Sequence, residues 1–185
     1  MKYLFIMGPS GSGKTTLAKF LQSSKPDKYK RITQITTRAP REGEVEGNEY
    51  FFYTEEQYKT LSLEKGMIAQ VKEEFAPGMY GTPISLLDET KMNVVVSSIE
   101  GFLDALNKLK PEDKSHVLFI RDVKPEAERP ERNYLYEEKY NRIVLHKLQE
   151  GQKKFNLIEV THGYLKRIRN NEILMNRFLC THKVK

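Results

Sequence analysis

The sequence has very little cysteine, no tryptophan and no long apolar run. Cys180 is the only cysteine among 185 residues, so an internal disulfide and a cysteine-based metal site are both excluded. No apolar stretch approaches the roughly 18 residues that a membrane-spanning helix needs, and the stretch at residues 3–7 is too brief for a signal peptide. We therefore expect a cytoplasmic protein that makes no membrane contact.

Histidine is sparse as well, and its spacing fits neither a metal site nor a catalytic triad. We expect ordinary core or surface roles for the four histidines, His116, His146, His162 and His182. The length and a hydrophobic content of 38% indicate one globular domain over residues 1–185. A net charge of +6 suits an anionic ligand without identifying it.

What the sequence does contain is a glycine-rich phosphate-binding loop, Gly8-Pro-Ser-Gly-Ser-Gly13-Lys14-Thr15, directly after the apolar stretch 3–7. In such a loop the backbone N–H groups surround a phosphate at the positive end of a helix. Any side chain larger than the hydrogen atom of glycine would obstruct the approach of the phosphate. Lys14 adds a charge for the β- and γ-phosphates, and the Thr15 hydroxyl can bind Mg²⁺. The predicted ATP-binding residues are Gly8, Pro9, Ser10, Gly11, Ser12, Gly13, Lys14, Thr15 and Thr16.

The hydrophobic pattern predicts an α/β fold of the P-loop NTPase type, with a parallel sheet core flanked by helices. Strands are expected at 3–7, 31–36, 50–53, 68–71, 93–97, 116–121 and 157–161, and helices at 16–22, from 54, and at 100–109, 138–149 and 164–179. Two segments interrupt the core of residues 1–33, 84–122 and 143–185. They are a β-rich insert at 34–83 and a charged lid at 123–142.

A second motif narrows the class of protein: Thr36-Thr-Arg38-Ala-Pro-Arg41-Glu-Gly-Glu-Val-Glu-Gly47-Asn-Glu-Tyr50-Phe-Phe, with Tyr80-Gly81-Thr82 as its companion. It resembles the segment by which guanylate kinases hold the acceptor nucleotide. The resemblance implies that Arg38, Arg41, Tyr50 and Tyr80 surround the acceptor phosphate and that the insert closes over it.

Chemistry supports the same assignment, because a dianionic acceptor needs fixed cations and planar donor groups to approach ATP. No general base is required, since the attacking group is already a phosphate oxygen. The resemblance also implies two arginines on the lid and the helix after it. The candidates are Arg132 and Arg142, with Arg129 a competitor for the first, and the predicted catalytic set is Lys14, Arg38, Arg132 and Arg142.

The base-reading positions depart from the family pattern of one serine or threonine and two carboxylates. Gln34 stands at the serine position, the first carboxylate aligns near Gln70 or Val71, and the second aligns with Ser98. Glu73, Glu74 and Glu100 lie close by in sequence, and no aspartate follows the strand around Val94 to help anchor Mg²⁺. The predicted acceptor-binding residues are Gln34, Arg38, Arg41, Tyr50, Gln70, Tyr80, Thr82 and Ser98.

The leading hypothesis is an ATP- and Mg²⁺-dependent nucleoside monophosphate kinase, most simply a guanylate kinase that converts GMP or dGMP to the diphosphate. The alternatives are a kinase for another nucleoside monophosphate or a phosphorylated sugar, and a non-catalytic binding module, against which the intact P-loop argues. The basic residues Lys166, Arg167, Arg169 and Arg177 alternate with apolar ones as in a packing helix, so we expect no nucleic-acid partner. Small nucleotides are the expected partners of a monomer or homodimer.

Overall fold

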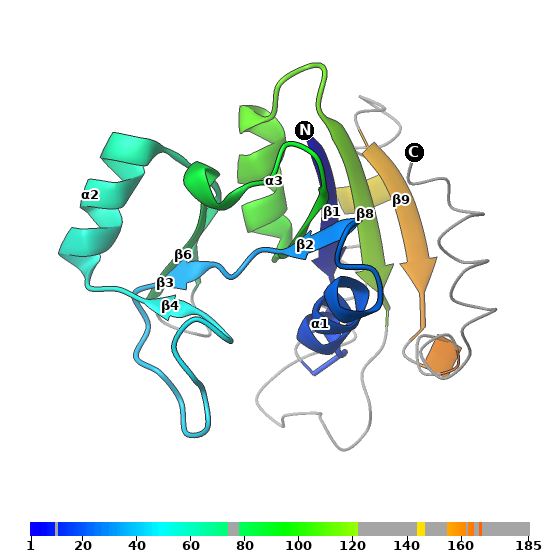
Figure 1. Cartoon of the computed structure of the whole chain (residues 1–185), viewed down its shortest axis with the longest axis horizontal. Helices are drawn as coiled ribbons and strands as arrows, with labels where there is room; N and C mark the ends of the chain where they lie inside the picture. The colour runs from blue at the N-terminus through cyan, green and yellow to red at the C-terminus, as the bar shows by residue number, and fades with distance from the viewer. Residues whose placement is uncertain are drawn as a thin grey trace.

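The structure is a computed structural model that describes residues 1–9, 11–73, 78–121, 144–146, 155–161, 163–164 and 167. Its core is a five-stranded sheet in the order β2-β7-β1-β8-β9 (Figure 1). The strands are β1 (Lys2–Met7), β2 (Tyr29–Arg31), β7 (Met92–Val96), β8 (Lys114–Ile120) and β9 (Phe155–Val160), and every pairing is parallel. The predicted parallel α/β core is therefore confirmed.

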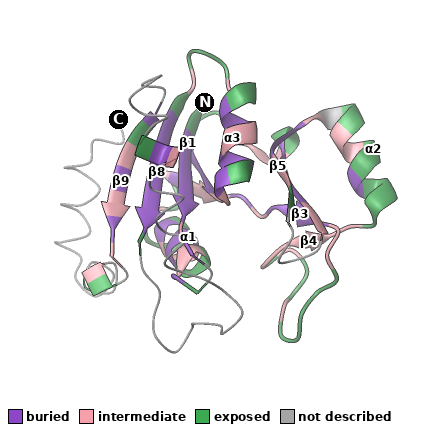
Figure 2. Ribbon diagram, turned by 180° about the vertical axis from the view of Figure 1, so that it is seen from behind, coloured by how far each residue is buried: buried purple, intermediate pink, exposed green. Residues whose placement is uncertain are grey.

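Two helices cover opposite faces of this sheet. From α1 (Lys14–Ser24), Leu17 and Leu21 pack in one cluster with Ile6 of β1. From α3 (Ile99–Lys108), Phe102 packs in a second cluster with Phe5, the neighbour of Ile6 whose side chain points to the other face. Figure 2 shows most of β1 and β8 as buried, which explains why residues 3–7 and 117–120 are continuously apolar.

A second sheet stands beside the core, with strand order β4-β3-β6-β5. It consists of β3 (Ile35–Thr36), β4 (Phe51–Phe52), β5 (Met67–Glu73) and β6 (Gly78–Pro83), followed by the short η1 (Ile84–Leu86). The helix α2 (Glu55–Lys65) packs on one face, where its Tyr58 joins Ile35 and Met67 in a small cluster.

The single strand predicted at 31–36 is wrong, because the chain changes sheets within it. Arg31 pairs with Val94 of the core, whereas Ile35 pairs with Phe51 and Gly81 of the second sheet. Ile32 and Ile35 are buried on either side of the crossing, so the positions of the apolar residues carried no sign of it.

The helices predicted at 138–149 and 164–179, and the predicted lid, lie almost wholly outside the described residues. Residues 144–146 are helical within the first of these predicted helices, and residues 164 and 167 are helical within the second. Cys180 and the basic residues Lys166, Arg169 and Arg177 also lie outside the described part of the chain.

The start of α2 is fixed by a reciprocal pair of hydrogen bonds between Thr54 and Gln57. Thr54 Oγ1 accepts from the Gln57 N–H at 3.2 Å, and Gln57 Oε1 accepts from the Thr54 N–H at 2.8 Å. We expect Thr54→Ala to lower the free energy of unfolding by about 1 kcal/mol, measured by urea denaturation. The exposed Thr60→Ala on the same helix is the control and should change it by less than about 0.5 kcal/mol, because no cap is lost.

A buried histidine makes stability depend on pH. His116 on β8 is 3% exposed; its Nδ1 lies 3.3 Å from Asn156 Nδ2, and its Nε2 has no hydrogen-bond partner in the described part of the chain. Burial, and then the charge of Lys114, lower the pKa of His116 below its ordinary value of 6.5. The folded protein therefore resists taking up a proton that the unfolded chain accepts.

As the pH falls below about 6.5, unfolding is expected to become easier by up to about 1.4 kcal/mol per pH unit from this group. Above that pH both states are neutral and the contribution is zero. Urea denaturation at a series of pH values checks this, with His116→Gln expected to flatten the slope between about pH 6.5 and 5. An unchanged slope in that variant would assign the acid sensitivity to other groups.

Candidate functional site

The P-loop connects the end of β1 to the start of α1, at the carboxyl edge of the core strands. Gly8 has φ +145°, and a Cβ there would lie 2.5 Å from the backbone oxygen of Ile120 at the end of β8. Gly11 and Gly13 have φ +82° and +88°, and Gly13 is the N-cap of α1. These glycines are required by backbone conformation and, at Gly8, by close approach of a neighbouring strand.

Lys14 folds back over this loop. Its Nζ donates to the carbonyl oxygens of Gly8 and Pro9 at 2.8 and 2.7 Å. Thr15 and Thr16 follow on the first turn of α1 and are exposed, whereas Ser12 is fully buried. The structure thus places a cation, a glycine-rich backbone and an accessible hydroxyl at one helix N-terminus; Ser10 lies outside the described residues.

A second cationic centre lies on the insert, around Arg38. The Arg38 guanidinium donates through Nε to the Tyr80 hydroxyl at 3.0 Å and lies 5.4 Å from the centroid of the Tyr50 ring. Tyr50 and Tyr80 meet edge to face with centroids 5.6 Å apart. Burial raises the pKa of Tyr50, so its hydroxyl stays protonated and can act as a neutral donor.

Glu44 completes this centre, and sequence reasoning assigned it no role. Its two carboxylate oxygens accept from Arg38 Nη1 and Nη2 at 2.8 and 3.0 Å, and one of them also accepts from the Arg41 N–H at 2.8 Å. The bond to Arg38 holds the pKa of Glu44 below its usual value, and Glu44 in turn raises the pKa of Arg38. The arrangement is a built oxyanion site, with a planar carboxylate in the fork of an arginine.

Arg41 contributes its backbone N–H to this centre, and its side chain is exposed. Four of the residues predicted to surround the acceptor phosphate, Arg38, Arg41, Tyr50 and Tyr80, therefore lie at or next to one centre. The signal in the sequence that could have revealed the rest of this centre was the carboxylate of Glu44, three residues after Arg41.

Among the predicted acceptor-binding residues, Gln34 and Thr82 lie together. Both are buried, and Gln34 Nε2 donates to Thr82 Oγ1 at 3.0 Å. Thr82 lies two residues from Tyr80 on β6, so the two side chains share one face of the second sheet. This face leads from the arginine centre toward the Gln34–Thr82 pair.

Gln70 is separated from them. Its Nε2 donates to Ser62 Oγ at 2.8 Å, and its Oε1 accepts from Lys108 Nζ at 2.6 Å, so its side chain lies on the α2 side of the sheet. The cause is a bulge in β5, where the register shifts between Ile68 and Val71 and Ala69 has φ +54°. One extra residue in a strand reverses which face the next side chain occupies. Gln70, which was predicted to bind the acceptor, therefore lies away from the Gln34–Thr82 pair.

Ser98 has a local structural role as the N-cap of α3, where its Oγ accepts from the Gly101 N–H at 3.3 Å. Glu100 follows on the first turn of that helix. The side chain of Glu73, together with Glu74, Arg129, Arg132 and Arg142, lies outside the described part of the structure.

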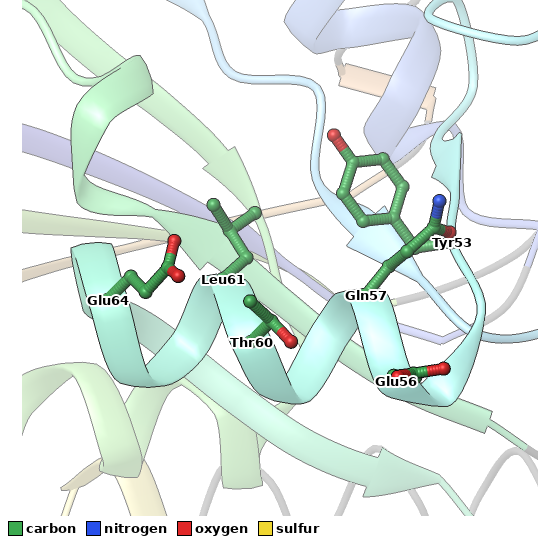
Figure 3. Close-up of a pocket in the computed structure, with 6 residues that line it drawn as sticks. All are labelled: Tyr53, Glu56, Gln57, Thr60, Leu61 and Glu64. Atoms are coloured by element: carbon green, nitrogen blue, oxygen red, sulfur yellow. The ribbon is translucent and has the colours of Figure 1, made fainter.

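A hollow along α2 does not fit a phosphate ligand. Figure 3 shows it along the helix, with the carboxylates of Glu56 and Glu64 toward its two ends. Tyr53, Gln57, Thr60 and Leu61 form the rest of its lining. Two carboxylates would repel an anion, so this hollow is separate in chemistry from the P-loop and the arginine centre.

Among the described residues, none of the His, Cys, Asp and Glu side chains group in a way that could hold a metal ion. In the same part of the chain, no helix is long and apolar enough to cross a membrane.

The glycine-rich loop lies on the core and the Arg38 centre lies on the insert, and comparison with known sequences shows the family of the chain. The sequence model described as guanylate kinase matches residues 1–172. The chain belongs to the guanylate kinase family. A family member named guanylate kinase from Prochlorococcus marinus (strain MIT 9312) is 37% identical over 137 residues, which are 71% of each chain.

Other members of the family match over shorter lengths. The guanylate kinase of Parasynechococcus marenigrum (strain WH8102) is 46% identical over 78 residues, and that of Bacillus subtilis (strain 168) is 33% identical over 87. These alignments span 41% and 42% of the two relatives, about two fifths of their length. The crystal structure of guanylate kinase from Anaplasma phagocytophilum superposes with a TM-score of 0.55 over 99% of this chain and 88% of that one, at 17% identity, and supports the fold.

Proposed function

We propose that this member of the guanylate kinase family transfers the γ-phosphate of ATP to a nucleoside monophosphate, with GMP or dGMP as acceptor. The observation that carries the proposal is the Arg38 centre, which holds the Glu44 carboxylate in a two-point contact at 2.8 and 3.0 Å. A monophosphate offers the same arrangement of oxygens with more charge, so it can replace that carboxylate. The products would be ADP and a nucleoside diphosphate.

In this proposal the P-loop binds ATP, and Lys14 leaves the carbonyls of Gly8 and Pro9 for the β- and γ-phosphates. Arg38, Arg41, Tyr50 and Tyr80 hold the acceptor phosphate. Catalysis then consists of alignment and neutralisation of charge on the transferred group. Arg132 and Arg142 are proposed to add charge from the lid.

Mg²⁺ is the proposed cofactor, and the donor chemistry at the P-loop fits it. The exposed Thr15 hydroxyl is a hard oxygen ligand beside the phosphate loop, and Mg²⁺ commonly keeps several waters. Bound there with ATP, Mg²⁺ would neutralise phosphate charge. Because β7 is followed by Ser97 and Ser98 instead of an aspartate, Thr15 and water carry more of its anchoring.

In this proposal the acceptor base lies beside Gln34 and Thr82, and Ser98 is a further candidate contact. The bond from Gln34 Nε2 to Thr82 leaves the amide oxygen of Gln34 to accept from the N–H groups of guanine. The insert at 34–83 and the lid at 123–142 would close over both nucleotides and exclude water. We further propose a cytoplasmic enzyme that acts as a monomer or homodimer, without nucleic-acid or membrane partners.

A coupled ADP-release assay tests the proposal. The purified chain is supplied with ATP and Mg²⁺ and with GMP, dGMP, AMP, dTMP or dUMP in turn, and a reaction without acceptor measures ATP hydrolysis. We expect turnover with GMP or dGMP at least about tenfold above the other acceptors. Selective turnover of an acceptor with a different base would show that the enzyme is specific for that base. Absence of turnover with all five acceptors would reject the proposed activity.

A further inference from the structure

The chain between β3 and β4 carries the acceptor-phosphate centre and is bonded to the core as well as to its own sheet. Glu49 Oε1 accepts from Lys19 Nζ of α1 at 2.9 Å, and the side chains of Lys19 and Glu49 are 40% and 24% exposed. The same helix begins at Lys14 of the P-loop. In Figure 1, α1 and this segment lie in the same lower half of the molecule.

A second core residue, Arg31, contacts the same part of this segment, the turn formed by residues 45–50. Arg31 of β2 donates through Nη2 to the carbonyl oxygens of Asn48 and Glu49, and Thr33 Oγ1 donates to the Gly47 carbonyl at 3.2 Å. Because β2 is paired in the core sheet, the bonds of the Arg31 guanidinium connect the turn to the core.

The turn itself is closed by bonds from both ends. Glu49 Oε2 accepts from the Val45 N–H at 3.0 Å, and the Gly47 N–H donates to the Tyr50 carbonyl at 2.8 Å. Tyr50 follows Glu49 directly, and its ring lies beneath the Arg38 guanidinium. A displacement of Glu49 would therefore move Tyr50 and, through it, Arg38.

We propose that the Lys19–Glu49 ion pair, with Arg31, forms a latch that sets the position of the acceptor-phosphate centre relative to the P-loop helix. On this view Lys19, Arg31 and Glu49 are positioning residues: they touch neither nucleotide and act through Tyr50. The inference rests on the proposed phosphoryl transfer for its kinetic effect, but the ordering of the turn is independent of any activity.

The size of the effect follows from the exposure of the pair. A partly exposed ion pair contributes little to the free energy of unfolding. When such a pair positions reacting groups, however, we expect its loss to lower kcat/KM for the acceptor about fivefold. Salt screens such pairs, so the effect should shrink in about 0.5 M salt.

A double-mutant cycle tests the latch, with Lys19→Met, Glu49→Gln and the double variant. The glutamine side chain introduced by Glu49→Gln still accepts from the Val45 N–H, so this substitution removes charge while keeping the turn's own bond. We expect each single variant to lower kcat/KM for the acceptor about fivefold with KM for ATP unchanged, and the double variant to be no slower than either single one. Melting temperatures should fall by no more than about 3 °C.

The exposed pair Lys59–Glu55 on α2, at 3.5 Å, provides a matched control cycle, Lys59→Met and Glu55→Gln, that should leave the kinetics within about twofold. Amide hydrogen exchange supplies a measurement that does not depend on enzyme activity. The backbone N–H groups of residues 47–49 should exchange faster than in the wild type in Lys19→Met and not in Lys59→Met. Additive losses in the cycle, or unchanged exchange in that turn, would overturn the latch. If the wild type turns over none of the acceptors while exchange responds as expected, the proposed function fails and the latch stands.

Discussion

Turnover in the Lys14→Ala variant is expected to fall at least about 1,000-fold, to the limit of the coupled assay. The ammonium group is held at one helix N-terminus by the carbonyls of Gly8 and Pro9, 2.8 and 2.7 Å away, so it is already positioned where the β- and γ-phosphates would bind. Alanine removes the charge without changing the backbone of α1, because alanine has the highest helix propensity. The measurement is kcat at saturating ATP and GMP.

The control is Lys59→Ala, which removes an exposed lysine from α2 and should retain full activity. A thermal melt of Lys14→Ala should show a cooperative transition close to that of the wild type. If a folded Lys14→Ala protein kept even a tenth of the wild-type kcat, the P-loop could not be the donor site of the reaction.

Arg38→Lys should lower kcat/KM for the acceptor about 100-fold, although the charge is kept. The guanidinium makes two parallel bonds to Glu44 and a third, through Nε, to Tyr80. A lysine offers a point charge that cannot make this planar two-point contact with a phosphate. Losing one or two charge-assisted hydrogen bonds corresponds to about 2.7 kcal/mol.

For Arg38→Lys, KM for ATP is the internal reference and should change less than about twofold, because the P-loop is untouched. Arg167→Lys, at an exposed arginine, is the matched substitution and should have no kinetic effect. A rise in KM for ATP with unchanged acceptor kinetics would move Arg38 to the donor side of the site.

The sequence predicted the core and the place of the glycine-rich loop between β1 and α1, for physical reasons that are local. Strands buried on both faces must be apolar throughout, as Val94 and Phe5 are, and a phosphate loop needs glycine at positions such as Gly8, where a neighbouring strand leaves no room for a side chain. Each of these requirements is met by residues within one short segment of the sequence. The family membership then follows from two such segments at their fixed order in the chain.

The details that escaped prediction depend on partners distant in sequence. The end of β2 and the start of β3 are decided by Val94 and Gly81, and the orientation of Gln70 is decided by a bulge opposite β6. The role of Glu44 becomes visible only with Arg38 folded back over it. Periodicity within one segment does not contain this information.

The crossing between the two sheets also bears on how the chain folds. Arg31 of β2 pairs with Val94 of β7, so this contact of the core closes a loop of roughly 60 residues, which carries a large entropic barrier if that loop is unstructured. The enclosed residues build their own sheet, with β6 hydrogen-bonded to both β3 and β5. If that sheet forms first, it brings the ends of the loop together and shortens the search that β2 and β7 must make. The insert at 34–83 would then serve as the early scaffold of the fold, and substitutions within it would slow refolding more than they speed unfolding.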